Sequence, residues 1–175
     1  VTAFHAEGGG QLGDVGTITA PTGVIAVNVT KKLPDGAVIM IGSVTEGTVA
    51  VGDAVTFAVD KARKMDIARN HTATHLLHAA LKQVLGAHVN QAGSYVGPDR
   101  LRFDFSHFSQ VTAEELKKVE AIVNEQVLAG KAVNIEELPI EEAKKKGATA
   151  LFGEKYGNIV RVVTVPDFSM EFCGG

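Results

Sequence analysis

The sequence predicts an α+β fold, with a small N-terminal antiparallel β-barrel followed by an α+β domain whose helices pack on a mostly antiparallel sheet. Glycine, β-branched residues and turn signals crowd residues 1–60, a spacing typical of short antiparallel strands. From Ile67 the apolar residues recur at helical spacing. Strand-like and helix-like segments then follow without an internal repeat. We therefore expect two units, residues 1–60 and residues 61–175.

The N-terminal unit is divided by four turn signals. These are Pro21-Thr22-Gly23, Pro34-Asp35-Gly36, Glu46-Gly47 and Gly52-Asp53. Between them lie three candidate strands, Gly23–Val29, Ala37–Val44 and Ala54–Asp60, which suffice to close a small barrel. The charged stretch 61–65 that follows is predicted to be a bridge between the two units.

An amphipathic helix and a hairpin are predicted next. The helix begins near Ile67 and ends at Gly86, and its apolar residues at helical spacing are Leu77, Leu81, Val84 and Leu85. Two strand-like runs, 88–96 and 100–106, flank Gly97-Pro98-Asp99 and predict the hairpin, with Leu101, Phe103 and Phe105 on one face.

The remaining elements complete the α+β layer. Thr112-Ala-Glu-Glu115 has the pattern of a capping box and predicts a second helix up to Gly130, with Leu116, Val119, Val123 and Val127 along one side. A strand 132–138, a short helix 140–146, a strand 158–165 and a final strand 169–173 follow.

Composition limits the class of protein. The 175 residues carry a net charge of −3, so bulk positive charge does not hold nucleic acid here and any RNA contact must be local. No apolar run approaches the ~20 residues of a membrane span, and a single cysteine excludes an internal disulfide framework. We expect a cytoplasmic protein with no membrane partner. Because the chain starts at Val1 and stops at Gly175 without a polar tail, we also expect a piece of a longer protein.

A metal site is the sharpest functional prediction. His71 and His75 are four residues apart, which on a helix places their Cβ atoms about 5–6 Å apart on one face. Spacing alone equally allows two partly exposed histidines on a polar stripe. Cys173, whose alternative role is that of a small buried apolar residue, precedes two glycines that leave room for close approach. One thiolate with two imidazoles suits zinc, so we predict that the three residues bind one zinc ion.

Two neighbouring residues narrow the chemistry. Zinc peptidases of the His-Glu-x-x-His type keep a glutamate after the first histidine as general base, and this chain has Thr72 there. His78 lies seven residues beyond His71, about 10.5 Å along a helix, which is too far for one small ion. We expect His78 to support the site rather than to bind the metal.

A glycine-rich segment, Gly8-Gly-Gly10-Gln-Leu-Gly13, has the letters of the dinucleotide fingerprint G-x-G-x-x-G. The fingerprint requires a strand before the glycines and a helix after them, whereas few residues precede this segment and a strand-like run follows it. Two alternatives stay open, a tight structural turn or a loop whose bare backbone approaches a ligand.

Three motifs together resemble the editing region of alanyl-tRNA synthetases. They are Thr2-Ala-Phe-His-Ala-Glu-Gly-Gly-Gly-Gln-Leu-Gly-Asp14, Arg69-Asn-His-Thr-Ala-Thr-His-Leu-Leu-His78 and Glu171-Phe-Cys-Gly-Gly175. Threonyl-tRNA synthetases and free-standing alanyl-editing proteins share the histidine and cysteine motifs, but the glycine-rich opening is the alanyl arrangement. In the family the last motif continues to a histidine that is the fourth metal ligand, and this chain stops before it. His5 stands where the family usually has tyrosine.

The resemblance implies zinc-dependent hydrolysis of the ester that joins serine or glycine to the 3′-terminal ribose of alanine-specific tRNA. A binding pocket for alanine cannot reject such similar amino acids strongly. A second site that hydrolyses the wrongly attached amino acid is therefore needed. Zinc would either lower the pKa of a bound water or orient the aminoacyl group. The remaining domains of the parent synthetase would attach alanine to the tRNA with ATP.

The resemblance also implies roles for individual residues. Thr74 and Gln91 are candidates in the catalytic site for pairing with the serine hydroxyl, and their alternative is ordinary polar surface. Gly9, Gly10 and Gln11 are implied to touch the substrate. Lys144-Lys145-Lys146 is a candidate contact with tRNA phosphates or, alternatively, a solvated charge run. The rival hypothesis is a non-catalytic tRNA-binding module held together by a structural zinc.

Overall fold

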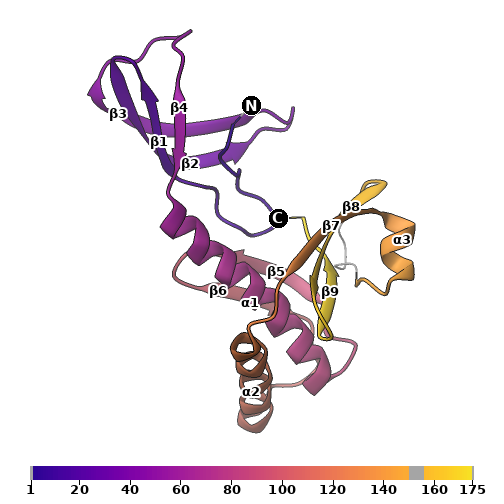
Figure 1. Ribbon diagram of the computed structural model, residues 1–175. Helices are drawn as coiled ribbons and strands as arrows, with labels where there is room; N and C mark the ends of the chain where they lie inside the picture. The colour runs from indigo at the N-terminus through magenta and orange to yellow at the C-terminus, as the bar shows by residue number, and fades with distance from the viewer. Residues whose placement is uncertain (1, 150–155, 175) are drawn as a thin grey trace.

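The computed structural model describes residues 2–149 and 156–174. Within them the chain has three helices and three antiparallel sheets, so the predicted α+β class is confirmed. Figure 1 shows the long helix α1 connecting an N-terminal sheet to the other elements. The C-terminal end of the chain lies beside the N-terminal glycine-rich segment (Figure 1).

The N-terminal sheet is open. Its strands are β1 (Gly16–Ala20), β2 (Gly23–Lys32), β3 (Val38–Gly47) and β4 (Thr56–Val59), in the order β3-β2-β1-β4. Strand β1 was not among the three candidate strands, although a strand-like run was noted after Gly13; it lies between β2 and β4. The edge strands β3 and β4 do not pair with each other in the described part of the chain. The predicted closed barrel is therefore not seen.

Helix α1 spans Lys61–Leu85, so it includes the charged bridge 61–65 and begins earlier than the predicted start near Ile67. The reason is an N-cap: the Asp60 side chain accepts the backbone N–H of Arg63 at 3.0 Å. This cap starts the helix directly at the end of the N-terminal unit. Gly86 ends the helix as predicted, and its N–H donates to the carbonyl of Lys82 at 3.0 Å.

The hairpin of β5 (Gln91–Val96) and β6 (Leu101–Phe105) packs against α1, which also packs against α2 (Ala113–Ala129). The buried residues of this core are Ala80, Leu81, Val89 and Val119, and Phe103, Phe105 and Val123 pack against them. Helix α2 begins with the predicted capping box and ends at Gly130. Leu116 and Val127, predicted to lie on its apolar side, are 53% and 58% exposed.

The last sheet has the order β7-β8-β9, with β7 (Asn134–Pro139), β8 (Ile159–Val165) and β9 (Ser169–Phe172), and the short helix α3 (Ile140–Lys145) follows β7. The helices thus cover two separate sheets instead of one. Val160 and Val162 share a core with Ala143 of α3, so the alternate β8 side chains, Arg161 and Val163, face the other side of the sheet. None of the helices among the described residues is long and apolar enough to cross a membrane.

Candidate metal centre

Helix α1 and the end of β9 bring the three predicted metal ligands together. His71 and His75 lie on one face of the helix, with their rings stacked at 5.2 Å between centroids. Cys173 follows β9, and its Sγ lies 3.2 Å from Nε2 of His71. The potential ligand atoms of the three residues all lie within 4.8 Å of one another. The three residues could hold a metal ion, although Cys173 is 102 positions from His71 in the sequence.

These residues fit a zinc ion. Zn–S bonds of about 2.3 Å and Zn–N bonds of about 2.0–2.1 Å place tetrahedral sulfur and nitrogen ligands roughly 3.5 Å apart, close to the observed Cys173–His71 spacing. The Nε2 atom of His75 is buried and lacks a well-formed hydrogen bond within the described ranges, so it is available to a metal. A thiolate and two imidazoles are ligands that zinc accepts readily.

Glu171 anchors the centre, and the sequence analysis did not identify this role. One carboxylate oxygen lies 2.6 Å from Nδ1 of His75, and the other lies 2.7 Å from Nδ1 of His78. The carboxylate is nearly inaccessible, with 6% of its side chain exposed. It orients His75 so that Nε2 points to the metal position, an arrangement typical of histidine ligands. His78 therefore supports the site, as predicted, through Glu171.

Electrostatics keep these groups charged without a metal. Burial opposes ionisation of Cys173, but the neighbouring histidines outweigh it and lower the pKa of the thiol to about 5. Burial likewise opposes the charged form of His75, yet the Cys173 and Glu171 side chains raise its pKa to about 9. Interactions with His75 and His78 overcome burial and lower the pKa of Glu171 to about 2. The lowered pKa favours the Cys173 thiolate, the form that binds metal, whereas the raised pKa of His75 means that its Nε2 must lose a proton when a metal binds.

A small cavity adjoins the ligands. Its volume is about 30 Å³, and it is lined by Gly9, His71, Thr74, His75, Gln91, Ser94, Val96, Phe103, Glu171, Cys173 and Gly174. Both residues predicted to recognise the serine hydroxyl are therefore at the metal centre. The hydroxyl of Thr74 donates to the carbonyl of Asn70 at 2.9 Å, and the amide nitrogen of Gln91 donates to Oγ of Ser94 at 3.2 Å.

A larger cavity opens from the same ligands. Its volume is about 480 Å³, and its lining is His5, Gln11, Lys64, Ala68, His71, Thr72, His75, Val133, Ile135, Arg161, Val163 and Gly174. His71, His75 and Gly174 line both cavities, so the metal position lies between them. Burial lowers the pKa of His5; Asp14 opposes this shift and the positive charges around the cavity reinforce it.

The glycine-rich segment is a tight turn that packs on β5. Backbone hydrogen bonds close it between Gly8 and Gln11, and the carbonyl of Gly10 accepts the N–H of Val96 at 2.8 Å. Gly10 has φ +84°, and a Cβ there would collide with the backbone and hydroxyl of Ser94. Gly9 lines the small cavity and Gln11 the larger one, whereas Gly10 lines neither. The turn is thus both structural and adjacent to the metal centre.

Ser94 connects this turn to the cavity, and no sequence signal singled it out. Its hydroxyl lies 3.2 Å from the carbonyl of Gly9 and 3.2 Å from the amide nitrogen of Gln91. It can donate to the carbonyl while accepting from the amide. Only the pairing of the glycine turn with β5 places the three groups together.

Comparison with known proteins finds similarity to tRNA synthetases. A family model described as tRNA synthetases class II (A) matches residues 1–63. The chain is 59% identical over 99% of its length to an alanine–tRNA ligase of Acetivibrio thermocellus, of which it covers 20%. It is 58% identical over its full length to an alanine–tRNA ligase of Geobacillus kaustophilus. It is also 58% identical, over 99% of its length, to an alanine–tRNA ligase of Listeria innocua. It covers 20% of each of these relatives.

The chain is similar along its whole length to alanine–tRNA ligases. It spans about a fifth of the length of these relatives. The three lysines at the end of α3, Lys144, Lys145 and Lys146, line neither cavity beside the candidate metal ligands. Lys144 and Lys146 contact nearby glutamates, at 3.0 Å from Glu141 and 3.5 Å from Glu136, which favours the solvated charge run.

Proposed function

We propose that this segment is the zinc-dependent editing part of an alanine–tRNA ligase, which hydrolyses the ester of serine or glycine on the 3′ end of alanine-specific tRNA. The observation that carries the proposal is the position of His71, His75 and Cys173 between two cavities of unequal size. The small cavity suits an amino-acid side chain. The larger one has the volume of a small-molecule site and suits the terminal nucleotide.

In this proposal the small cavity distinguishes serine from alanine by hydrogen bonding. The hydroxyl proton of Thr74 is already donated to Asn70, so its oxygen is left as an acceptor. The amide nitrogen of Gln91 is engaged by Ser94, so its carbonyl oxygen is left as a second acceptor. A serine hydroxyl would donate to one of them. Alanine has no donor and would place its methyl group against the unpaired acceptor, which lowers its rate of hydrolysis, whereas glycine places no apolar group there.

The chain's own residues then hold the reacting ester in place. His71, His75 and Cys173 would bind the zinc ion, and Glu171 keeps the His75 ring in the orientation that presents Nε2. Bound zinc would supply a Lewis acid that polarises the ester carbonyl or lowers the pKa of a water. The backbone at Gly9 limits the small cavity and restricts the size of the amino acid.

The experiment is deacylation by the intact ligase that contains this segment. Seryl-, glycyl- and alanyl-tRNA are incubated with the enzyme, and release of each amino acid is measured with and without chelator. We expect release of serine and glycine, retention of alanine, and loss of release with chelator or with His71→Ala. His107→Gln, at a histidine that lines neither cavity, is the matched control and should keep full activity.

The same experiment tests the rival function, a tRNA-binding module with a structural zinc. Such a module would bind tRNA and lose that binding when zinc is removed, yet release no amino acid. The accessible cavities on both sides of the metal ligands favour chemistry, because structural zinc sites are closed. Tight tRNA binding without release of serine or glycine would contradict editing and support the rival.

A further inference from the structure

The larger cavity beside the metal ligands contains a hydroxyl group without an internal partner. Thr72 lines this cavity together with the candidate ligands His71 and His75. Among the residues that the structure describes, nothing pairs with its hydroxyl, whereas the hydroxyl of Thr74 donates to the carbonyl of Asn70. A helical threonine has two favoured rotamers, and bonding to the preceding turn is only one option for its hydroxyl. The unpaired hydroxyl can both donate to a ligand and accept from it.

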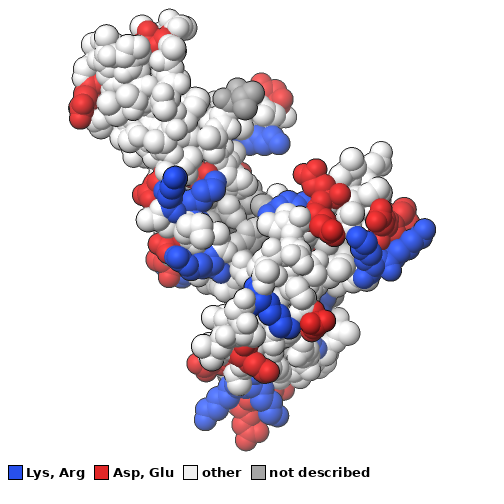
Figure 2. Space-filling model, viewed as in Figure 1, with Lys and Arg blue, Asp and Glu red and all other residues white. Residues whose placement is uncertain are grey.

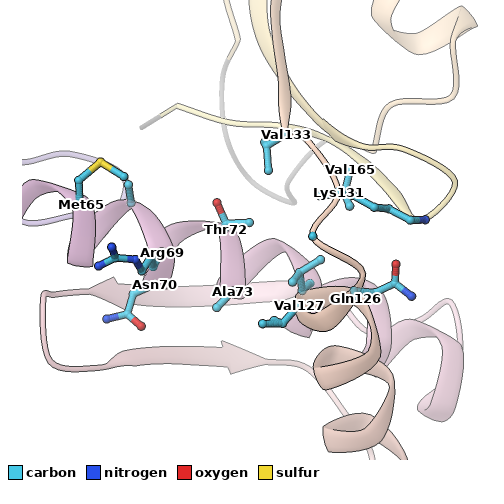
Figure 3. Close-up of a pocket in the computed structure, with 13 residues that line it drawn as sticks. Met65, Arg69, Asn70, Thr72, Ala73, Gln126, Val127, Lys131, Val133 and Val165 are labelled. Carbon is cyan, nitrogen blue, oxygen red and sulfur yellow. The ribbon is translucent and has the colours of Figure 1, made fainter.

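Helical geometry places this hydroxyl beside both histidine ligands. Thr72 directly follows His71 and precedes His75 by three residues, and side chains three residues apart on a helix are neighbours. Figure 3 shows the Thr72 hydroxyl pointing out of α1 on the side of Val133, opposite to the side of Asn70. Val133, from the segment before β7, lines the same cavity. The hydroxyl therefore faces the space between the helix and that segment, next to the metal position.

The other polar side chains of the cavity are less available to a ligand near the metal. Lys64 is paired with Asp14, and Arg161 is engaged in an interaction within the protein. The Nε2 atom of His5 is buried. Gln11 reaches the cavity from the glycine turn and not from the helix that holds the histidine ligands. The threonine hydroxyl is thus the unengaged polar group on the same helix as the ligands.

The substrate of the proposed reaction brings a second hydroxyl to this place. In that reaction the ester lies at the metal ligands and the terminal nucleotide occupies the larger cavity. The 2′ hydroxyl of the ribose is on the carbon next to the one that carries the 3′ ester, so it is the polar group of the ribose nearest to the reacting bond. Figure 2 shows a recess between the first turns of α1 and the region of β7 and β8, through which a nucleotide can enter.

We infer that the Thr72 hydroxyl binds the 2′ hydroxyl of the terminal ribose and makes the site selective for an RNA end over a 2′-deoxy end. This inference rests on the proposed editing function. The 2′ hydroxyl is both a donor and an acceptor, and it is the group by which a protein distinguishes RNA from DNA. A contact next to the ester also limits the orientations of the ribose, so that the carbonyl stays at the metal ligands.

The test compares seryl-tRNA that ends in adenosine with seryl-tRNA that ends in 2′-deoxyadenosine. The value of kcat/KM for release of serine is measured with the intact, zinc-loaded ligase, and the ratio of the two values cancels any loss of zinc that affects both substrates. Thr72→Val should lower this ratio roughly tenfold, the effect of one hydrogen bond, and Thr72→Ser should retain it. Thr17→Val, at an exposed threonine of β1, is the matched control and should keep the ratio. Equal ratios in Thr72→Val and Thr17→Val would overturn the contact, as would an equal loss in Thr72→Ser.

A binding measurement separates failure of this inference from failure of the proposed function. Adenosine analogues that carry serine in a 3′ amide, with and without the 2′ hydroxyl, are titrated by calorimetry, because they report recognition of the ribose even if no ester is cleaved. The difference between the unaltered ligase and Thr72→Val isolates this site from other nucleotide sites of the enzyme. A preference for the hydroxyl that Thr72→Val removes, without release of serine from tRNA, would support the contact and overturn editing. Release of serine with the same preference in both proteins would overturn the contact and leave editing in place.

Discussion

The Nδ1 atom of His75 lies 2.6 Å from a carboxylate oxygen of Glu171, although the two residues are 96 positions apart. The contact joins the middle of α1 to β9 and is buried on both sides. It fixes which imidazole nitrogen faces Cys173, because a histidine that donates from Nδ1 presents its lone pair at Nε2. One carboxylate therefore links the orientation of the His75 ring to the packing of β9 on α1.

Glu171→Gln should weaken zinc binding by roughly 10–100-fold while leaving all three ligands in place. In the unaltered protein each carboxylate oxygen of Glu171 contacts one histidine. A glutamine amide has only one accepting oxygen and no charge, so the orientation of His75 is less well defined. Zinc affinity is measured by competition with a chromogenic chelator. Glu141→Gln, an exposed glutamate on α3, is the control and should bind zinc like the unaltered protein. Equal affinities in both variants would contradict the role of Glu171.

Acid should destabilise the metal-free protein through the same carboxylate. The pKa of Glu171 is lowered from 4.5 to about 2 by its histidine partners, against the effect of burial. A lowered pKa contributes stability above the unfolded value, so this contribution is complete above about pH 4.5 and is lost as the pH falls towards 2. Thermal unfolding of Glu171→Gln and the unaltered protein is followed from pH 6 downwards. Their difference should shrink below about pH 4.5, and a constant difference would exclude this linkage.

Loss of any one ligand should remove the metal. His71→Ala, His75→Ala and Cys173→Ala should each contain one equivalent of zinc less than the unaltered protein, because three ligands from this segment meet at one point. Elemental analysis after dialysis checks the stoichiometry, with His107→Gln as the matched histidine control. A full zinc complement in all three variants would place the metal elsewhere.

Serine recognition should depend on Ser94 as well as on Gln91. Gln91→Ala should narrow the ratio of seryl- to alanyl-tRNA hydrolysis by roughly tenfold or more, since a lost polar pairing is worth that much. Ser94→Ala should narrow it less, because it frees the Gln91 amide without removing it. The measurement is kcat/KM for both substrates. An unchanged ratio in Gln91→Ala would remove this residue from the site.

Gly10→Ala should both destabilise the protein and disturb the small cavity. Gly10 has φ +84°, and a Cβ there would meet the backbone of Ser94. Gly52 provides the control, because its φ is +97° but no atom lies within 4 Å of its Cβ position. Gly52→Ala should cost only the conformational strain, roughly 1–2 kcal/mol. Chemical unfolding should show a larger loss for Gly10→Ala, and equal losses would contradict the close packing on β5.

Local patterns in the sequence predicted several elements correctly. The Thr112 capping box starts α2, Gly86 ends α1, and the Gly97-Pro98-Asp99 turn lies between β5 and β6. Each depends on residues close together in the chain, so its signal is local. The predicted start of α1 was too late. The Asp60 side chain caps the helix, so the helix already includes the five charged-stretch residues that follow. The barrel was wrong because closure depends on pairing between edge strands that are distant in sequence.

By itself the sequence determined the ligand types, since two histidines one helical turn apart and a cysteine before glycines are readable from spacing and chemistry. It also determined that His78 is too far along the helix to join them. Only the tertiary structure decided that Glu171 orients His75, that Ser94 joins Gly9 to Gln91, and that Arg161 faces the cavity of Lys64. These relationships arise where β5, β8 and β9 meet α1 and the glycine turn, and no local pattern encodes which faces of separate elements will pack together.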